Sequence, residues 1–330
     1  MSPAFLALLG PTASGKSDLA VAVAIRLDGE VVSLDSRQVY RGMDIGTAKL
    51  PLGERCGVPH HGLDLLSPDQ TYSVGRFARD ARGWIGDIQG RGRVPVLVGG
   101  TGFFLRALTA PLFREPPLEP TRRRALRRWL AGRELAELAR WARALDPERA
   151  ELAAEGGPQR LCRTLEVALL TGRPLSWWHR NMPAEVAPLT GVTVSVKLPR
   201  EEVDRRIDSR VDAMFAAGLE SEVRRLLASG CGAEAPGMTG LGYREMALLL
   251  AGRIDRREAV ARIKRATRAY ARRQATWFRN QLPPEVVEVD GLASMEERVN
   301  RVVEAWRRAF GAATLAGTGG KHFPGRGAGA

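Results

Sequence analysis

Eight residues near the N-terminus form a complete phosphate-binding loop of the pattern G-x-x-x-x-G-K-[ST], with the sequence Gly10-Pro11-Thr12-Ala13-Ser14-Gly15-Lys16-Ser17. The backbone N–H groups of such a loop converge on phosphate oxygens. Lys16 would neutralise the outer phosphate, and the hydroxyl of Ser17 would ligate Mg²⁺. The residues expected to hold a phosphorylated small molecule are Gly10, Thr12, Ala13, Ser14, Gly15, Lys16 and Ser17.

The segments on either side of this loop are the ones that must position it. The apolar run Phe5–Leu9 predicts a buried strand, and Leu19–Ile25 predicts a helix whose N-terminus adds a positive field at the loop. A chance match in a chain with 36 glycines would not also supply a strand and a helix in the right places. The loop therefore indicates a site for a phosphorylated ligand.

Two further predicted strands end at residues that can do chemistry. Glu30–Leu34 leads into Asp35, and Val94–Val98 leads into Gly99-Gly100-Thr101-Gly102. Ligands of a doubly wound sheet bind at the carboxyl ends of the strands, so Asp35 is expected to face the phosphate as a magnesium ligand, a general base or only a helix cap. The later strand offers the hydroxyl of Thr101 and no acid to activate water. Its glycines let the backbone approach a ligand, which favours group transfer over nucleotide hydrolysis.

At this point the sequence resembles a known family, the bacterial tRNA dimethylallyltransferases. The resemblance covers roughly residues 4 to 280, and seven blocks carry it in family order: 10–17, 35–49, 59–64, 97–102, 159–167, 242–245 and 267–278. One departure is that Gly156-Gly157-Pro158 stands where the family usually has Asn or Asp before Gln159-Arg160. That puts a polar RNA contact or a cap in this loop in doubt.

The resemblance implies the transfer of a dimethylallyl group from dimethylallyl diphosphate to N6 of the adenosine at position 37, next to the anticodon, of tRNAs that read codons beginning with U. Diphosphate leaves, and Mg²⁺ on Ser17 and the charge of Lys16 stabilise it. Asp35 would accept the proton of the amine, and Thr101 would donate to the bridging oxygen. Arg206 and Arg210 share a helix face and are candidates to clamp the diphosphate; we favour Arg210, unless both only pair with Glu202 or Asp208.

The family's contacts with tRNA carry over to a larger set of residues. The target base must leave its stack, so we expect the anticodon stem-loop to be read in a splayed state. The expected tRNA-binding residues are Asp35, Ser36, Arg37, Gln38, Thr101, Arg123, Gln159, Arg160, Leu161, Cys162, Arg163, Arg244, Arg272 and Arg273.

Charge supports a polyanionic partner. The chain has a formal net charge of +13, and residues 114–133 carry +5 of it while residues 253–279 carry the remaining +8. Concentrated basic faces are typical of nucleic-acid binding, although solvated helix faces without a partner are the plain alternative. In the second segment a stripe at helical spacing is expected to pack on the core rather than stack on bases: Val260, Ile263, Thr267, Tyr270, Gln274 and Trp277.

The sequence predicts an α/β fold: a P-loop NTPase-like core with a parallel sheet, an α-helical insertion domain and C-terminal helices. The expected boundaries are 1–115 for the first part of the core, 116–189 for an insertion that binds tRNA, 190–310 for the second part with basic helices, and 311–330 for a disordered Gly/Ala-rich tail. We expect a cytoplasmic monomer that contacts no membrane, since no run of 18 apolar residues occurs and the three cysteines suggest no disulfide framework.

Two rival functions share some of these features. An ATP-dependent small-molecule kinase would also use the phosphate loop and Mg²⁺, but it does not need the charge of residues 253–279. A non-catalytic RNA-binding module would tolerate the loss of Lys16, Asp35 or Thr101, and all three are present.

Overall fold

A single six-stranded parallel sheet organises the chain. The computed structural model describes residues 4–111, 116–182, 187–282 and 285–317. The strand order is β3-β2-β4-β1-β5-β6, and every neighbouring pair is parallel. This confirms the predicted α/β class. The strands are β1 (Phe5–Leu9), β2 (Gly29–Ser33), β3 (His60–His61), β4 (Val94–Gly99), β5 (Gly191–Lys197) and β6 (Val287–Asp290).

The chain divides into two compact units. The core unit comprises residues 1–109 and 189–330, and the inserted unit comprises residues 110–188. The sequence prediction drew these boundaries at 116 and 189. Because β5 pairs with β1 in register from Phe5–Gly191 to Leu9–Ser195, the second half of the core unit completes the sheet begun by the first.

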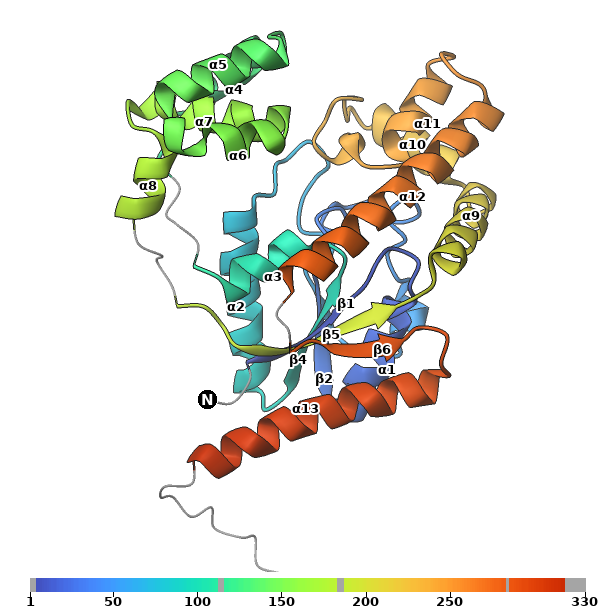
Figure 1. The fold of residues 1–330 in the computed structure, drawn as a ribbon. Helices are drawn as coiled ribbons and strands as arrows, with labels where there is room; N and C mark the ends of the chain where they lie inside the picture. The colour runs from blue at the N-terminus through green and yellow to red at the C-terminus, as the bar shows by residue number, and fades with distance from the viewer. Residues whose placement is uncertain (1–3, 112–115, 183–186, 283–284, 318–330) are drawn as a thin grey trace, which may run out of the picture. The chain divides into compact units, whose positions relative to one another are not determined.

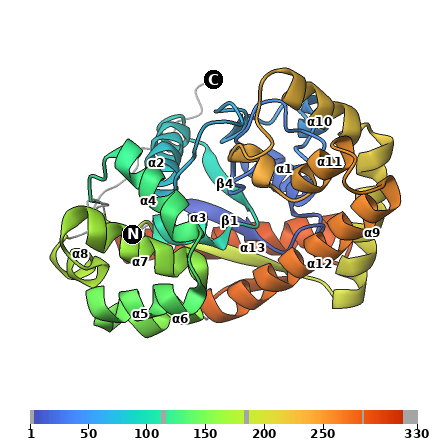
Figure 2. The same cartoon turned by 90° about the horizontal axis from the view of Figure 1, so that it is seen from above.

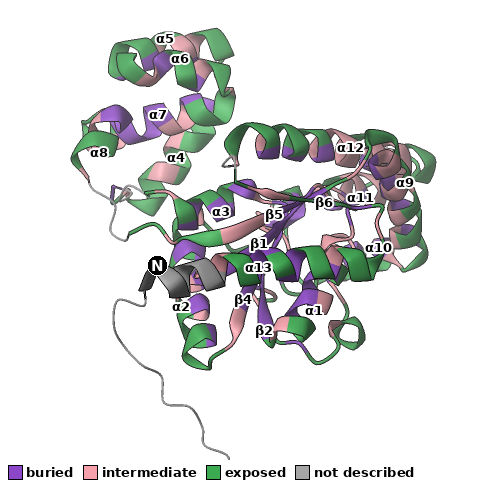
Figure 3. Cartoon of the chain, turned by 60° about the horizontal axis from the view of Figure 1, so that its bottom comes forward, coloured by how far each residue is buried: buried purple, intermediate pink, exposed green. Residues whose placement is uncertain are grey.

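Helices cover both faces of the sheet in the core unit (Figure 1). On one face lie α1 (Lys16–Leu27) and α13 (Met295–Gly317), and on the other lie α2 (Val74–Gly90), α3 (Gly102–Thr109) and the end of α12 (Arg256–Gln281). All five residues of β1 are fully buried between these layers (Figure 3). Full burial of a large apolar side chain stabilises the fold by about 1.5–3 kcal/mol, so the strand that delivers the phosphate loop is rigidly held.

A second helical cluster adjoins the sheet in the same unit. The helices α9 (Arg200–Ala216), α10 (Leu219–Ala228) and α11 (Tyr243–Leu250) gather around α12, as Figure 2 shows from above. Two short 3₁₀ turns, Leu52–Arg55 and Gly237–Thr239, lie in the connecting segments. Ile263 and Ala271 of α12 are buried in this cluster, so part of the predicted stripe packs as expected.

The inserted unit is a helical bundle with its own small core. Its helices are α4 (Pro120–Ala131), α5 (Leu135–Leu145), α6 (Pro147–Glu155), α7 (Pro158–Thr171) and α8 (Leu175–Asn181). Leu130, Leu138 and Leu161 meet in that core. Gly157, at the start of α7, has φ 82° and ψ −174°, a conformation nearly restricted to glycine. The departure from the family pattern at this position thus has a backbone reason.

The C-terminal segment departs from expectation. Residues 311–330 were predicted to be disordered, but α13 continues through Gly317, because the Ala- and Leu-rich stretch after Gly311 favours a helix. Residues 318–330 lie outside the described part of the chain. Within that part, no helix is at once long and apolar enough to cross a membrane.

Candidate active site

The phosphate loop lies at the carboxyl end of β1, directly before α1. Ser14 is fully buried, and Lys16 Nζ donates a hydrogen bond to the carbonyl oxygen of Pro11 at 3.1 Å. The side chain of Lys16 therefore folds back over its own loop. This is the arrangement in which its ammonium group and the loop amides face the same anion.

Gln274 of α12 ties this loop to the neighbouring strand. Its Oε1 accepts from the N–H of Thr12 at 2.8 Å, and its Nε2 donates to the carbonyl oxygen of Gly100 at 3.0 Å. A Cβ on Gly100 would lie 2.0 Å from Gln274 Nε2, and one on Gly102 would lie 2.2 Å from the ring of Trp277. These two glycines therefore admit α12. Gly99 and Gly100 also line the cavity beside Lys16, so their close approach to a ligand stays a prediction.

Three cavities meet around the phosphate loop, and Arg210 lines all of them. The outer cavity (430 Å³) lies along Ala13–Asp18 and Arg206. The inner cavity (70 Å³) is lined by Thr12, Lys16, Ser17, Asp35 and Tyr270. The apolar cavity (340 Å³) shares Asp35 and Tyr270 with the inner one and has a wall formed by Ile207, Val211, Met214 and Ile263.

Positive charge is concentrated where the outer and inner cavities join. Burial, and then the charge of Arg210, lowers the pKa of Lys16 to about 8, although Asp35 opposes the shift. Burial also lowers the pKa of Arg210, again against Asp35. Arg210 Nη1 donates to Thr12 Oγ1 at 3.2 Å, whereas Arg206 pairs with Glu202 at 2.5 Å. The preference for Arg210 as the buried cation at the site agrees with this geometry.

Asp35 follows β2 and lines the inner cavity, and Thr101 follows the adjacent strand β4, directly after Gly99 and Gly100, which line the same cavity. Asp35 Oδ1 accepts from the N–H of Arg37 at 2.8 Å, so the carboxylate does stabilise a turn. Among the described residues no hydrogen bond reaches Oδ2. Burial, and then the charge of Asp35, raises the pKa of the Tyr270 hydroxyl, while the nearby side chains of Thr101 and Gln274 oppose the shift.

The residues after Asp35, expected to bind tRNA, are largely occupied within the protein. Arg37 Nη1 donates to the carbonyl oxygen of Pro236 at 2.7 Å and to Thr239 Oγ1 at 3.3 Å. Gln38 accepts from Ser33 Oγ and donates to the carbonyl oxygens of residues 47 and 48. Ser36 lines the apolar cavity. Arg37 and Gln38 thus shape the wall of the site through intramolecular contacts.

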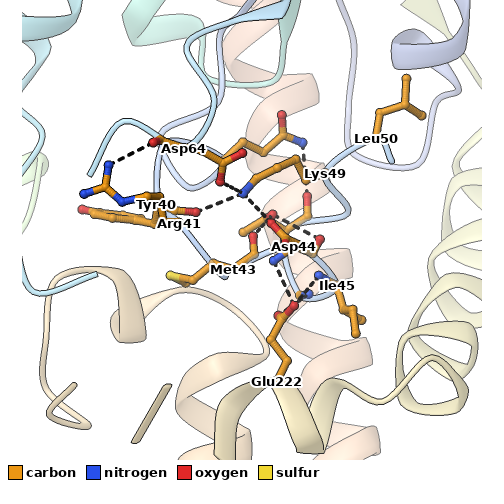
Figure 4. A network of polar contacts seen from close by, with 12 residues as sticks. Tyr40, Arg41, Met43, Asp44, Ile45, Lys49, Leu50, Asp64 and Glu222 are labelled. Carbon is orange, nitrogen blue, oxygen red and sulfur yellow. Dashed lines mark hydrogen bonds and ion pairs between the residues drawn. The ribbon is translucent and has the colours of Figure 1, made fainter. Parts of the chain in front are cut away.

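A buried carboxylate that the sequence analysis missed fixes the loop that contains residues 44–46 (Figure 4). Glu222 of α10 is 2% exposed and accepts from the N–H groups of Asp44, Ile45 and Gly46 at 2.9, 2.7 and 3.1 Å. The hydroxyl of Tyr243 donates to it at 2.6 Å. The resemblance already covered residues 44–46, but Glu222 lies almost 180 positions away in sequence, so no local pattern joined them.

Lys49 holds the other end of the same loop. Its buried ammonium group donates to the carbonyl oxygen of Tyr40 at 3.0 Å and to Asp44 and Asp64 at 2.6 Å each (Figure 4). Residues 46–48 of this loop line the three cavities. Glu222 and Lys49 therefore determine the shape of a wall that all three share.

In the inserted unit, several expected tRNA contacts have structural partners instead. Glu166 is 1% exposed and forms ion pairs with Arg123, Arg127 and Arg163. Leu161 is fully buried in the core of the inserted unit, so a contact with RNA would have to use its backbone, and this contact stays a prediction. Cys162 and Arg163 are partly buried, whereas the two residues before them, Gln159 and Arg160, are exposed.

The expected arginines of the C-terminal helices differ in their surroundings. Arg272 and Arg273 are exposed on α12; Arg272 lies 3.9 Å from Asp204, and Arg273 lies over the ring of Tyr270 and lines the apolar cavity. Arg268, one of the arginines of the basic segment 253–279, is held by both oxygens of Asp208. Arg244 shares a groove with Arg262 and Arg265.

Comparisons with known proteins identify the family to which the chain is similar. The family model described as IPP transferase matches residues 38–281. A tRNA dimethylallyltransferase of Roseiflexus sp. (strain RS-1) is 43% identical over 91% of this chain and 98% of its own, and one of Thermomicrobium roseum is 41% identical over 97% of both. The crystal structure of a full-length tRNA isopentenylpyrophosphate transferase from Bacillus halodurans has a TM-score of 0.68 at 33% identity, covering 94% of this chain and 99% of that one. A eukaryotic dimethylallyltransferase crystallised acting on tRNA has a TM-score of 0.72 at 26% identity, covering 94% and 77%.

Proposed function

The chain belongs to the IPP transferase family, and we propose that it transfers a dimethylallyl group from dimethylallyl diphosphate to tRNA, as the names of its relatives indicate. The proposed acceptor is N6 of adenosine 37 in tRNAs that read codons beginning with U. The observation that carries the proposal is the junction of the three cavities at Arg210. There a cationic phosphate loop, a carboxylate and an apolar wall adjoin one another. A prenyl diphosphate has the matching anionic and apolar ends.

The binding mode follows from the chemistry of the cavities. The diphosphate would lie on the loop amides with Lys16 and Arg210, and the five-carbon chain would lie against Ile207, Val211 and Met214. Burying that chain contributes about 0.8 kcal/mol per CH₂ group. The buried cations become most valuable as the leaving group gains charge, because the local dielectric constant is low.

The reaction breaks one C–O bond and forms one C–N bond. The lone pair of N6 attacks the carbon that carries the diphosphate, and the electron pair of the C–O bond leaves with the diphosphate. The proton lost by N6 goes to Asp35, whose Oδ2 is the oxygen not used in the turn at Arg37. We assign Thr101, with Tyr270 beside it, to the bridging oxygen of the leaving group.

The residues present fit a magnesium ion that arrives with the diphosphate. Mg²⁺ usually keeps several waters and takes one or two protein oxygens together with substrate phosphates. Ser17 lines both the outer and the inner cavity, with Asp18 and Asp35 nearby, and the described residues contain no cluster of three acidic, histidine or cysteine side chains that would form an all-protein cage. When bound, the ion would neutralise charge on the leaving diphosphate. Ser17 would hold it through its hydroxyl.

For the tRNA, we propose that exposed basic and polar residues bind the anticodon stem-loop. Gln159, Arg160, Arg244, Arg272 and Arg273 are the candidates, since they are exposed or line open grooves. Arg123 remains a candidate only if it can leave Glu166, which makes it the weakest member of the set. We further propose that the enzyme acts in the cytoplasm as a monomer.

The test is a pair of labelling reactions on unmodified tRNA with the full-length chain. With dimethylallyl diphosphate labelled in the prenyl group, label should enter the tRNA and inorganic diphosphate should appear in equal amount. With γ-labelled ATP, no label should move to tRNA or to a small molecule. Transfer from ATP would favour a kinase, and tRNA binding without any transfer would favour a non-catalytic module; either result would overturn the proposal.

A further inference from the structure

Two arginines from distant helices converge on the outer side of the phosphate loop. A Cβ built on Gly15 would lie 3.5 Å from Nη1 of Arg298 and 4.0 Å from Nη1 of Arg206. Arg206 belongs to α9, and Arg298 lies in the first turns of α13, which packs against α1. The packing of α13 on the helix that follows the loop therefore brings Arg298 to the loop itself.

Only one of the two guanidinium groups has a carboxylate partner among the described residues. Arg206 uses its Nε to bind Glu202, which leaves Nη1 directed at Gly15. Arg298 donates from Nε to the carbonyl oxygen of Ser294 at 3.4 Å, and in the described part of the chain no carboxylate forms an ion pair with it. Asp18 and Glu54 also line the outer cavity, but among the described residues neither forms an ion pair with these arginines. Since like charges repel, the two guanidinium groups beside Lys16 and Arg210 favour an anion between them.

The volumes of the cavities give an independent reason to expect an anion here. The inner cavity, at 70 Å³, has room for roughly two water molecules. A diphosphate group is several times larger than a water molecule, so part of it must extend into the outer cavity of 430 Å³. Ser14, which lines the outer cavity, is fully buried and its Oγ has no hydrogen-bond partner among the described residues.

We propose that Arg206 and Arg298 form an outer anion-binding position that takes the terminal phosphate of the diphosphate, in the substrate and again in the released product. The inference rests on the proposed function, which supplies the ligand. It adds α13 to the substrate site, although Arg298 lies beyond residues 38–281, which the family model matches.

Direct binding of inorganic diphosphate to the full chain tests the position without catalysis. Arg298→Gln and Arg206→Gln are each expected to weaken binding in calorimetry roughly tenfold, because each removes a charge-assisted contact. Arg298→Lys should keep part of the affinity. Arg307→Gln is the matched control. It makes the same charge change on the same helix, but at an exposed residue two to three turns further along. The affinity of this variant for diphosphate should equal that of the wild type. Unchanged affinity in both glutamine variants, or an equal loss in Arg307→Gln, would overturn the proposal.

Kinetics separate this position from the proposed function. In Arg298→Gln, KM for dimethylallyl diphosphate should rise while KM for tRNA stays unchanged, and the melting temperature should match that of Arg307→Gln. A wild-type chain that binds diphosphate through Arg298 but prenylates no tRNA would support the anion position and overturn the function. If the wild-type chain prenylates tRNA, and Arg298→Gln and Arg307→Gln have the same KM for dimethylallyl diphosphate, the function is supported and the anion position is overturned.

Discussion

The two carboxylate oxygens of Asp35 have different surroundings. Oδ1 stabilises the turn at Arg37, and Oδ2 is the oxygen that can receive a proton. Asp35→Asn keeps the turn, since an amide oxygen also accepts the N–H of Arg37. We expect the single-turnover rate to fall by about 10² to 10⁴ while tRNA affinity and melting temperature stay unchanged. An unaltered rate would reduce Asp35 to its role in the turn.

The side chain of Thr101 lies close enough to the hydroxyl of Tyr270 to influence the pKa of that hydroxyl. Thr101→Ala is expected to lower kcat by about 10² to 10³, the usual loss for one preorganised donor to a leaving oxygen. Thr101→Ser should recover most of the rate, since the hydroxyl remains. If the serine variant is as slow as the alanine variant, the methyl group and its packing are what matter.

Lys16 makes diphosphate affinity depend on pH. Its pKa is lowered from 10.5 to about 8 in the free protein, so the ammonium group loses its proton as the pH rises through about 8. Affinity for inorganic diphosphate should therefore fall between pH 7 and pH 9.5, and binding near pH 8 should take up a proton, which calorimetry in two buffers detects. Lys16→Arg remains charged throughout and serves as the control, because any titration of the ligand itself affects both proteins alike. Parallel pH profiles for the two proteins would contradict the assignment.

At the scale of elements, one buried carboxylate sets the position of a loop. Glu222→Gln places an amide N–H group against the N–H groups of Asp44, Ile45 and Gly46, so it is expected to cost about 3 kcal/mol of unfolding free energy. Because residues 46–48 line the cavities, KM for dimethylallyl diphosphate should also rise in the protein that remains folded.

Two further variants show whether that effect comes from the loop. Tyr243→Phe removes one donor to Glu222 and should give a smaller change in the same direction. Glu220→Gln on the same helix alters only surface ion pairs, with Arg224 and Arg256. The stability and the KM of this variant should therefore match those of the wild type. A rise in KM for Glu220→Gln equal to that for Glu222→Gln would argue against a role for the loop.

At the scale of the molecule, the arginines of α4 fall into two groups. Arg123 and Arg127 hold the buried Glu166, whereas Arg122, Arg124 and Arg128 are exposed on the same helix. Replacing the exposed three with Gln should raise KM for tRNA and flatten the slope of log affinity against log salt by roughly two to three units, with no change in melting temperature. The double replacement of Arg123 and Arg127 with Gln is the comparison. This variant, unlike the triple one, should have a lower melting temperature, because it leaves the buried carboxylate of Glu166 without two of its partners. A salt slope unchanged in the triple variant would mean that tRNA is bound elsewhere.

The sequence predicted the parts of the site that are local in the chain. The strand before Gly10, the strand before Asp35 and the parallel sheet are confirmed, because an apolar run followed by a glycine-rich turn is a local signal. Gln274 and Glu222 were missed, since each binds backbone groups far away in sequence and periodicity carries no information about such partners. Gln274 did leave one signal: it is the polar side chain on an otherwise mostly apolar stripe.

The contact between Gln274 and the phosphate loop has a consequence for the order in which parts of the protein can fold during synthesis. The N–H of Thr12 finds its partner 262 residues later in the chain, and β5, which pairs with β1, also follows the inserted unit. Domains generally fold as units during synthesis, with N-terminal parts first. Here the inserted unit is contiguous and can fold as soon as residue 188 has emerged. The phosphate loop lacks its hydrogen bond to Gln274 until α12 has been translated. The nascent chain thus acquires its helical insertion before it acquires an active site.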